Sequence, residues 1–160
     1  MSMTLSGSAL PRRLASVLIA ALFGLTLALN PMSAPNANAA VSAKVGIGAL
    51  HVAAAQVGVR YRYGGTSPRT GFDCSGLTQY SYARVGKHLP RVAQQQYRAT
   101  IRVSRSAARP GNLVSFYSGH SMYHVGIYAG RGYMYDAPHT GTRVKKQRIW
   151  TTHVLFGRVR

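Results

Sequence analysis

The sequence has few of the residues on which disulfide-rich and metal-binding proteins depend. Its 160 residues include one cysteine, so no internal disulfide can form, and its Cys and His residues show neither a CxxC nor an HExxH spacing. We therefore expect no metal and no cofactor. Acidic residues are also scarce, because two aspartates and no glutamate stand against 20 Lys and Arg, a formal net charge of +18. The hydrophobic content of 46% favours a globular domain over a disordered basic tail.

One long apolar run, residues 14–29, follows a pair of arginines near the amino terminus. After it comes a small-residue stretch that ends in an A-x-A triplet at residues 37–39, the order of a secretory signal. The alternative is a membrane anchor, but the run is shorter than the roughly 20 residues that a spanning helix needs. We therefore predict a signal peptide over residues 1–39 and an exported, monomeric domain over residues 40–160, in the cell wall or periplasm, without stable membrane insertion.

The order of periodic segments predicts an α+β fold. Helical spacing and turn residues indicate helices at residues 44–56, from an Asp73 cap to Gly86, and at 92–99. From residue 101 onward, short β-like runs alternate with glycine-containing turns. These predicted strands are residues 113–117, 124–129, 133–137, 143–149 and 154–159. Helices followed by strands favour N-terminal helices packed on a central antiparallel β-sheet.

The single cysteine, Cys74, directly follows Asp73, a residue type that caps helices. A thiol in the first helical turn lies near unpaired backbone N–H groups and the positive end of the helix dipole, which favour the thiolate. In an exported protein an unpaired thiol also suggests a reactive group. The alternative interpretation is an inert cysteine beside an ordinary cap. A nearby base distinguishes the two.

Among six histidines, His124 is the strongest candidate for that base, because it opens a strand that leads into a predicted hairpin. With the turn centred on Gly130, Asp136 lies directly opposite His124, close enough for its carboxylate to hold the imidazole. The roles then follow the logic of nucleophile, base and orienting acid for Cys74, His124 and Asp136. Two alternatives stay open. His139 replaces Asp136 if the turn is centred elsewhere, or Asp136 only pairs with a surface arginine.

Six segments, in this order, resemble the successive motifs of the NlpC and p-sixty family of bacterial cell-wall cysteine peptidases. They cover most of residues 50–150 and are Tyr61-Arg62-Tyr63-Gly64-Gly65, Gly71-Phe72-Asp73-Cys74-Ser75-Gly76-Leu77, Leu89-Pro90-Arg91, Arg109-Pro110-Gly111-Asn112-Leu113-Val114, His124-Val125-Gly126-Ile127-Tyr128 and Asp136-Ala137-Pro138. Two positions depart from the family pattern. The third catalytic position is often His, where this chain has Asp136, and the common Pro-Gly-Asp-Leu reads Pro-Gly-Asn-Leu here with Asn112.

The resemblance implies a papain-like domain with Cys74, His124 and Asp136 as its catalytic residues. It also implies hydrolysis of amide bonds in peptidoglycan stem peptides, typically between the γ-carboxyl of D-glutamate and a diamino acid. Tyr61, with Tyr63 as the alternative, matches a tyrosine whose hydroxyl joins the backbone N–H of Cys74 as an oxyanion donor. The matching motifs add a set of further oxyanion or substrate-binding positions, namely Asp73, Ser75 and Arg91.

The charge suggests a second kind of partner beside the stem peptides. A strongly basic domain is attracted to anionic wall polymers, although the arginine content alone is equally compatible with genome composition. No nucleic-acid-reading motif appears, and we expect no nucleic acid partner. A non-catalytic wall-binding domain, or an amidase or acyltransferase on the same fold, is the alternative function.

Overall fold

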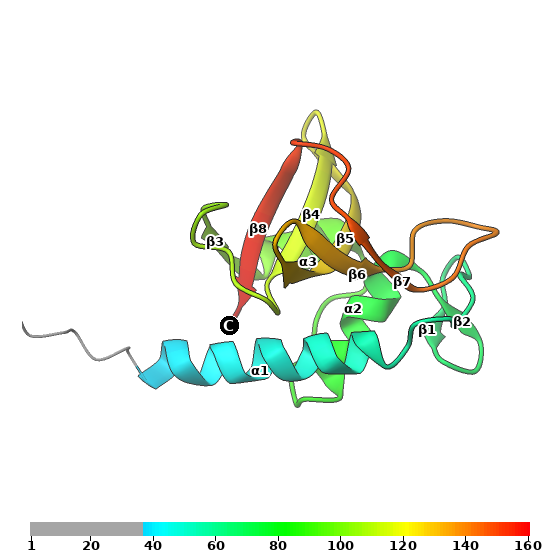
Figure 1. Ribbon diagram of the computed structural model, residues 1–160, viewed down its shortest axis with the longest axis horizontal. Coiled ribbons are helices and arrows are strands. Elements are labelled where there is room, and N and C mark those ends of the chain that lie inside the picture. Colours follow the sequence, from blue (N-terminus) through cyan, green and yellow to red (C-terminus); the bar gives the residue numbers. More distant parts are fainter. Residues whose placement is uncertain (1–36) are drawn as a thin grey trace, which may run out of the picture. The chain divides into compact units, whose positions relative to one another are not determined.

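A computed structural model of the protein describes residues 37–160 (Figure 1). The predicted signal peptide, apart from its last three residues, lies outside this part of the chain. Within the described residues, no helix combines the length and the apolar character needed to cross a membrane.

Three helices precede the main sheet, as the sequence predicts. They are α1 (Ala37–Ala54), α2 (Cys74–Ala83) and α3 (Ala93–Arg98). The beginning of α1 lies seven residues before the predicted start, since small alanine-rich residues continue its helical character toward the amino terminus. The predicted boundary between residues 39 and 40 therefore falls within its first turn.

The strands form one large antiparallel sheet and one short hairpin. The hairpin pairs β1 (Thr66–Ser67) with β2 (Gly71–Phe72), two short strands that are not among the predicted ones. The sheet has the spatial order β3-β8-β4-β5-β6-β7. Its strands are β3 (Thr100–Val103), β4 (Leu113–Ser118), β5 (Ser121–Gly130), β6 (Tyr133–Asp136), β7 (Lys145–Arg148) and β8 (Val154–Val159). The predicted α+β class, with helices packed on an antiparallel sheet, is confirmed.

Alternation along the strands separates two apolar clusters on opposite faces of the sheet. Leu113, Val125 and Ile127 join a cluster that includes buried residues of all three helices. Val114 and Phe116, which point the other way from β4, join a second cluster with residues of β6 and β8. Figure 1 shows α1 running along one end of the sheet, with α2 between α1 and the strands. The amino terminus of α2 is thereby held firmly against the domain.

The predicted register between β5 and β6 is wrong by two residues. Tyr128 pairs with Met134, so Asp136 does not lie directly opposite His124. The hairpin turns at residues 131–132, whose φ values of 52° and 79° fit a two-residue turn, and a bulge precedes it. This turn lies later than a turn centred on Gly130. Because the shift is an even number of residues, Asp136 still emerges on the face of His124.

Gly126 leaves room for the diagonal contact that results. A Cβ at this position would lie 2.9 Å from the sulfur of Met134 and 3.3 Å from the Cβ of Asp136. The absence of a side chain therefore lets the Asp136 carboxylate occupy the sheet face next to His124.

Candidate active site

The candidate nucleophile is the first residue of α2. Asp73 caps this helix in an extended conformation, with φ −93° and ψ 177°, and its Oδ1 accepts a 2.7 Å hydrogen bond from the Gly76 backbone N–H. The predicted cap is thus confirmed. Cys74 is partly exposed, and it lies in the turn where unpaired N–H groups and the helix dipole favour negative charge.

Asp73, Ser75 and Arg91, which the sequence assigns to oxyanion or substrate binding, form one hydrogen-bonded network. Arg91 donates from Nη1 to Oδ1 of Asp73 at 3.0 Å and from Nη2 to Oδ2 at 2.5 Å. It also donates to Ser75 Oγ at 2.9 Å. The Gly64 N–H donates to Asp73 Oδ2 at 2.9 Å. The network therefore attaches the loop that contains Gly64 to the start of α2. The role of Asp73, Ser75 and Arg91 in binding substrate stays a prediction.

Tyr61 lies in this fastened loop, near the thiol. Burial raises the pKa of the Tyr61 phenol, and negative charge on Cys74 and then on Asp73 raises it further. The hydroxyl accordingly stays protonated at neutral pH and available as a donor. Tyr63, the alternative, is 87% exposed.

The side chain of His124, on β5, is almost completely buried. It is 5% exposed, and its ring contacts that of Phe116, its partner on β4, at 5.2 Å between centroids. The Trp150 ring lies 5.4 Å from the imidazole and stacks on Phe116 at 4.3 Å. These aromatic contacts restrict the orientation of the imidazole.

Asp136 holds His124 from the other side. Its Oδ2 lies 2.8 Å from His124 Nε2, and the aspartate is fully buried. The structure therefore places Asp136 on the imidazole. His139 instead is exposed and forms a 2.9 Å contact from its Nδ1 to the Thr140 carbonyl.

Gln147, on β7, completes the surroundings of Asp136. Its Nε2 donates to Asp136 Oδ1 at 2.9 Å and to Oδ2 at 2.8 Å. Sequence reasoning missed this residue, which stands between basic residues in the sequence Lys145-Lys146-Gln147-Arg148. Gln147 could have been found from its pairing with Met134, because this pairing puts Gln147 on the same face of the sheet as Asp136. That register is visible only in the folded sheet.

The charge state of His124 reflects three competing influences. Burial, the largest of them, lowers its pKa, but hydrogen bonding and charge from Asp136 and Cys74 outweigh burial and raise the pKa to about 9. The action of Cys74 on this pKa means that the thiol and the imidazole are neighbours. The structure thus brings together Cys74, His124 and Asp136.

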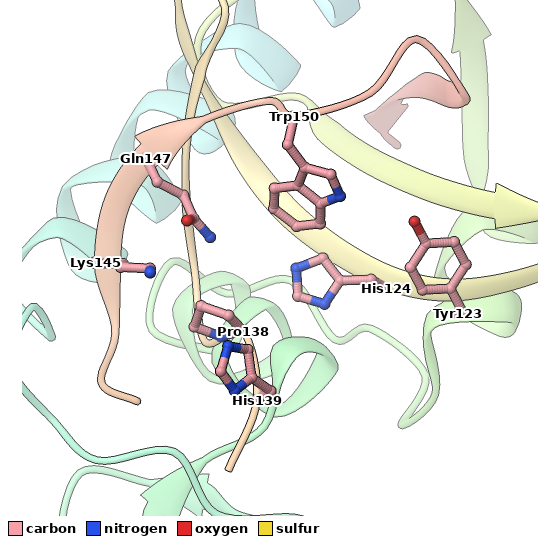
Figure 2. A pocket seen from close by; sticks show the side chains of 7 residues that line it. All are labelled: Tyr123, His124, Pro138, His139, Lys145, Gln147 and Trp150. Carbon is pink, nitrogen blue, oxygen red and sulfur yellow. The ribbon is translucent and has the colours of Figure 1, made fainter. Parts of the chain in front are cut away.

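A pocket of about 390 Å³ opens beside the imidazole (Figure 2). Its lining combines aromatic, polar and aliphatic side chains, which are Tyr123, His124, Pro138, His139, Lys145, Gln147 and Trp150. Within residues 37–160, no group of three or more His, Cys, Asp or Glu side chains is arranged to hold a metal ion.

Comparison with known proteins relates the chain to one family. The sequence model of the NlpC/P60 family matches residues 58–158. The bifunctional muramidase/DL-endopeptidase CwlT of Bacillus subtilis is 44% identical over 109 residues, which are 64% of this chain and 33% of CwlT. The chain therefore spans only about a third of that relative.

Solved structures show the same fold. The peptidoglycan hydrolase RipB from Mycobacterium tuberculosis is 30% identical, with a TM-score of 0.67 over 79% of this chain and 68% of that chain. Three structures of the Resuscitation Promoting Factor Interacting protein RipA also have TM-scores of 0.67, at 30% identity. The match to the structure mutated at a glutamate covers 74% of this chain and 64% of that chain; the other two are mutated at a cysteine and a histidine.

The family match covers more than half of the chain, and its segments enclose the thiol, the imidazole and the buried acid. The chain belongs to the NlpC/P60 family, as the ordered motifs of its sequence predict.

Proposed function

We propose that this chain is an exported cysteine endopeptidase that hydrolyses amide bonds in peptidoglycan stem peptides. The observation that carries the proposal is the buried pair of His124 and Asp136 beside a partly exposed thiol at a helix start. Nucleophile, base and orienting acid are the three parts that a covalent acyl-transfer mechanism needs.

The chemistry follows from the contacts of each group. His124 Nε2 is engaged by Asp136, so Nδ1 is the ring nitrogen that exchanges a proton with Cys74. The Cys74 sulfur attacks the amide carbonyl carbon, and the imidazolium then gives its proton to the departing amine as the C–N bond breaks. Water, deprotonated by His124, hydrolyses the thioester, which releases the carboxylic acid and returns the proton to the enzyme.

We assign to Tyr61 the support of the tetrahedral intermediates. Its protonated hydroxyl lies where the charge of Cys74 acts on it, and the backbone N–H of Cys74 belongs to the first turn of α2. Two donors near the developing oxyanion are the usual arrangement for acyl transfer, and removing one costs about 10²–10³ in kcat.

The name of CwlT gives two activities, a muramidase and a DL-endopeptidase. The surroundings of the two aspartates in this chain favour hydrolysis of peptides over hydrolysis of glycosides. Glycosidases need a protonated carboxylic acid opposite a second carboxylate. Asp73 is instead bonded to Arg91, and Asp136 to His124 and Gln147. The described residues contain no other acid, so a muramidase activity has no support here.

The bond we propose lies between the γ-carboxyl of D-glutamate and diaminopimelate. The DL-endopeptidase activity in the name of CwlT agrees with cleavage between a D- and an L-centre. The three mutated residues of RipA, a cysteine, a histidine and a glutamate, occur in the same order along its chain as Cys74, His124 and Asp136 do here. That order supports an acid in the third role.

Digestion of purified peptidoglycan, with fragments identified by mass, tests the proposal. Wild type should release fragments cut at the γ-D-glutamyl bond, and Cys74→Ala should release none while keeping the circular dichroism spectrum of wild type. His124→Ala should lose about 10²–10⁴ in rate, whereas His51→Ala, on the exposed side of α1, should retain full rate. Identical fragment profiles for wild type and Cys74→Ala would show a binding protein rather than an enzyme.

A further inference from the structure

The mechanism of hydrolysis does not by itself assign a role to the pocket beside His124. Figure 2 shows Lys145 and Gln147 projecting from β7 toward the segment with Pro138 and His139, while Trp150 stands over His124. The pocket therefore adjoins the residue that delivers a proton to the departing amine. The substrate residue that carries this amine must therefore lie close to the pocket.

Strand alternation separates Lys145 from its basic neighbours. Lys146 pairs across the sheet with Tyr135, and its ammonium lies 5.6 Å from the ring centroid of Tyr133 and 5.9 Å from that of Tyr135. Arg148 lies over Tyr133 on the same face. Lys145, by contrast, pairs with Asp136 and lines the pocket. It is the cation of β7 that faces the candidate site.

The charge of Lys145 is not balanced by an acid in the described part of the chain. The Asp136 carboxylate, although it belongs to the partner residue on β6, is taken by His124 and Gln147. Asp73 is paired with Arg91. Because the sequence holds no third acid, Lys145 presents an uncompensated positive charge to the pocket.

The other walls fit a ligand that is partly aliphatic. Trp150, held against Phe116, and Tyr123 offer aromatic surface, and Pro138 adds a further apolar wall. A chain of methylene groups that ends in a carboxylate satisfies both the apolar walls and the cation. Diaminopimelate has this chemistry.

We propose that this pocket is a carboxylate-recognition subsite for the diamino acid on the amine side of the scissile bond, with Lys145 as its charge partner. The inference rests on the proposed function, since it assigns a part of the same substrate. It makes Lys145 a specificity-determining residue, which selects free carboxylate over carboxamide.

The test compares a synthetic γ-D-glutamyl–diaminopimelate peptide with the same peptide in which the carboxyl groups of diaminopimelate are carboxamides. Lys145→Gln should lower kcat/KM for the carboxylate peptide about fivefold, the size expected for an exposed ion pair, and leave the carboxamide peptide unchanged. Lys145→Arg should keep the preference of wild type. The matched control Lys146→Gln, on the opposite face of β7, should behave as wild type for both peptides.

An equal loss for both peptides, or no loss for either, in Lys145→Gln would overturn the subsite. Failure of wild type to cleave either peptide would instead count against the proposed function. In that event the dissociation constants of the two peptides for the Cys74→Ala protein still decide the subsite. Tighter binding of the carboxylate peptide that disappears in Cys74→Ala/Lys145→Gln supports it, and equal binding of the two peptides refutes it.

Discussion

Asp136 is a carboxylate that is fully buried, and its contacts explain how a buried charge is tolerated. His124 meets one of its oxygens, and Gln147 donates to both. A buried ion without such partners costs several kcal/mol, so each partner stabilises the ionised aspartate and, through it, the orientation of the imidazole. Gln147 is accordingly a positioning residue.

Replacing Gln147 should reduce activity without removing any reacting group. We expect Gln147→Leu to lower kcat/KM about tenfold, because a hydrogen bond to a charged group is lost. Gln147→Glu keeps the size of the side chain but replaces the donating amide by a carboxylate. Its loss should be larger at neutral than at acidic pH, where a protonated glutamate can still donate. The pH profile of kcat/KM measures this, and a profile parallel to that of wild type in both variants would indicate a packing role only.

His124 should make stability depend on pH. Its pKa is about 9 in the folded chain against an ordinary 6.5, so the folded state binds the proton more tightly. The contribution of protonated His124 to the free energy of unfolding is therefore fully present below about pH 6.5, declines as the pH rises, and is lost above about pH 9. We expect the difference in free energy of unfolding between wild type and His124→Gln to shrink by about 3 kcal/mol over this range. Urea unfolding at pH 6 and pH 9.5 measures it, and a constant difference would contradict the shift.

Among the elements, α2 and the preceding loop are packed so closely that only glycine fits between them. A Cβ at Gly76 would lie 2.0 Å from the Gly65 carbonyl oxygen, and the same loop is tied to Asp73. This approach positions Tyr61 near Cys74. The short helix thus depends on its neighbours for the placement of both candidate oxyanion donors.

Gly76→Ala should destabilise the domain, although alanine is the better helix former by about 1 kcal/mol. The new methyl group meets backbone rather than a movable side chain, so we expect a loss of about 2 kcal/mol or more. Gly48→Ala in α1 is the matched control, because its Cβ would meet a side-chain methyl group of Val85 at 2.9 Å rather than backbone. Urea denaturation compares the two, and equal midpoints would show that the contact at Gly76 relaxes.

At the scale of the whole molecule, the two acids are both engaged by partners, so the remaining surface of the described domain is overwhelmingly positive. Such a surface attracts polyanions over a distance set by the ionic strength. We propose that it concentrates the enzyme on anionic wall polymers.

Binding to sedimented cell walls should therefore weaken as salt is raised from about 10 mM to about 150 mM, where the screening length falls from about 30 Å to about 8 Å. Co-sedimentation of the Cys74→Ala protein measures binding without digestion. Hydrolysis of a small soluble stem peptide by wild type is the control and should change much less. Salt-independent sedimentation would leave the charge without this role.

The local sequence was sufficient for the helix cap at Asp73, the position of Cys74 and the order of helices and strands. These features depend on neighbouring residues, and the six ordered motifs identified the family that the comparisons confirm. The contact between His124 and Asp136 was also predicted, but through a register that the structure corrects.

Only the tertiary structure decided which face of β7 meets Asp136, and hence the contacts of Gln147 and the exposure of Lys145 to the pocket. It also showed that Arg91 donates hydrogen bonds to both Asp73 and Ser75. The physical reason is that a cap is set by a few adjacent dihedral angles, whereas sheet register depends on a bulge and a turn whose position the alternation of residues does not fix.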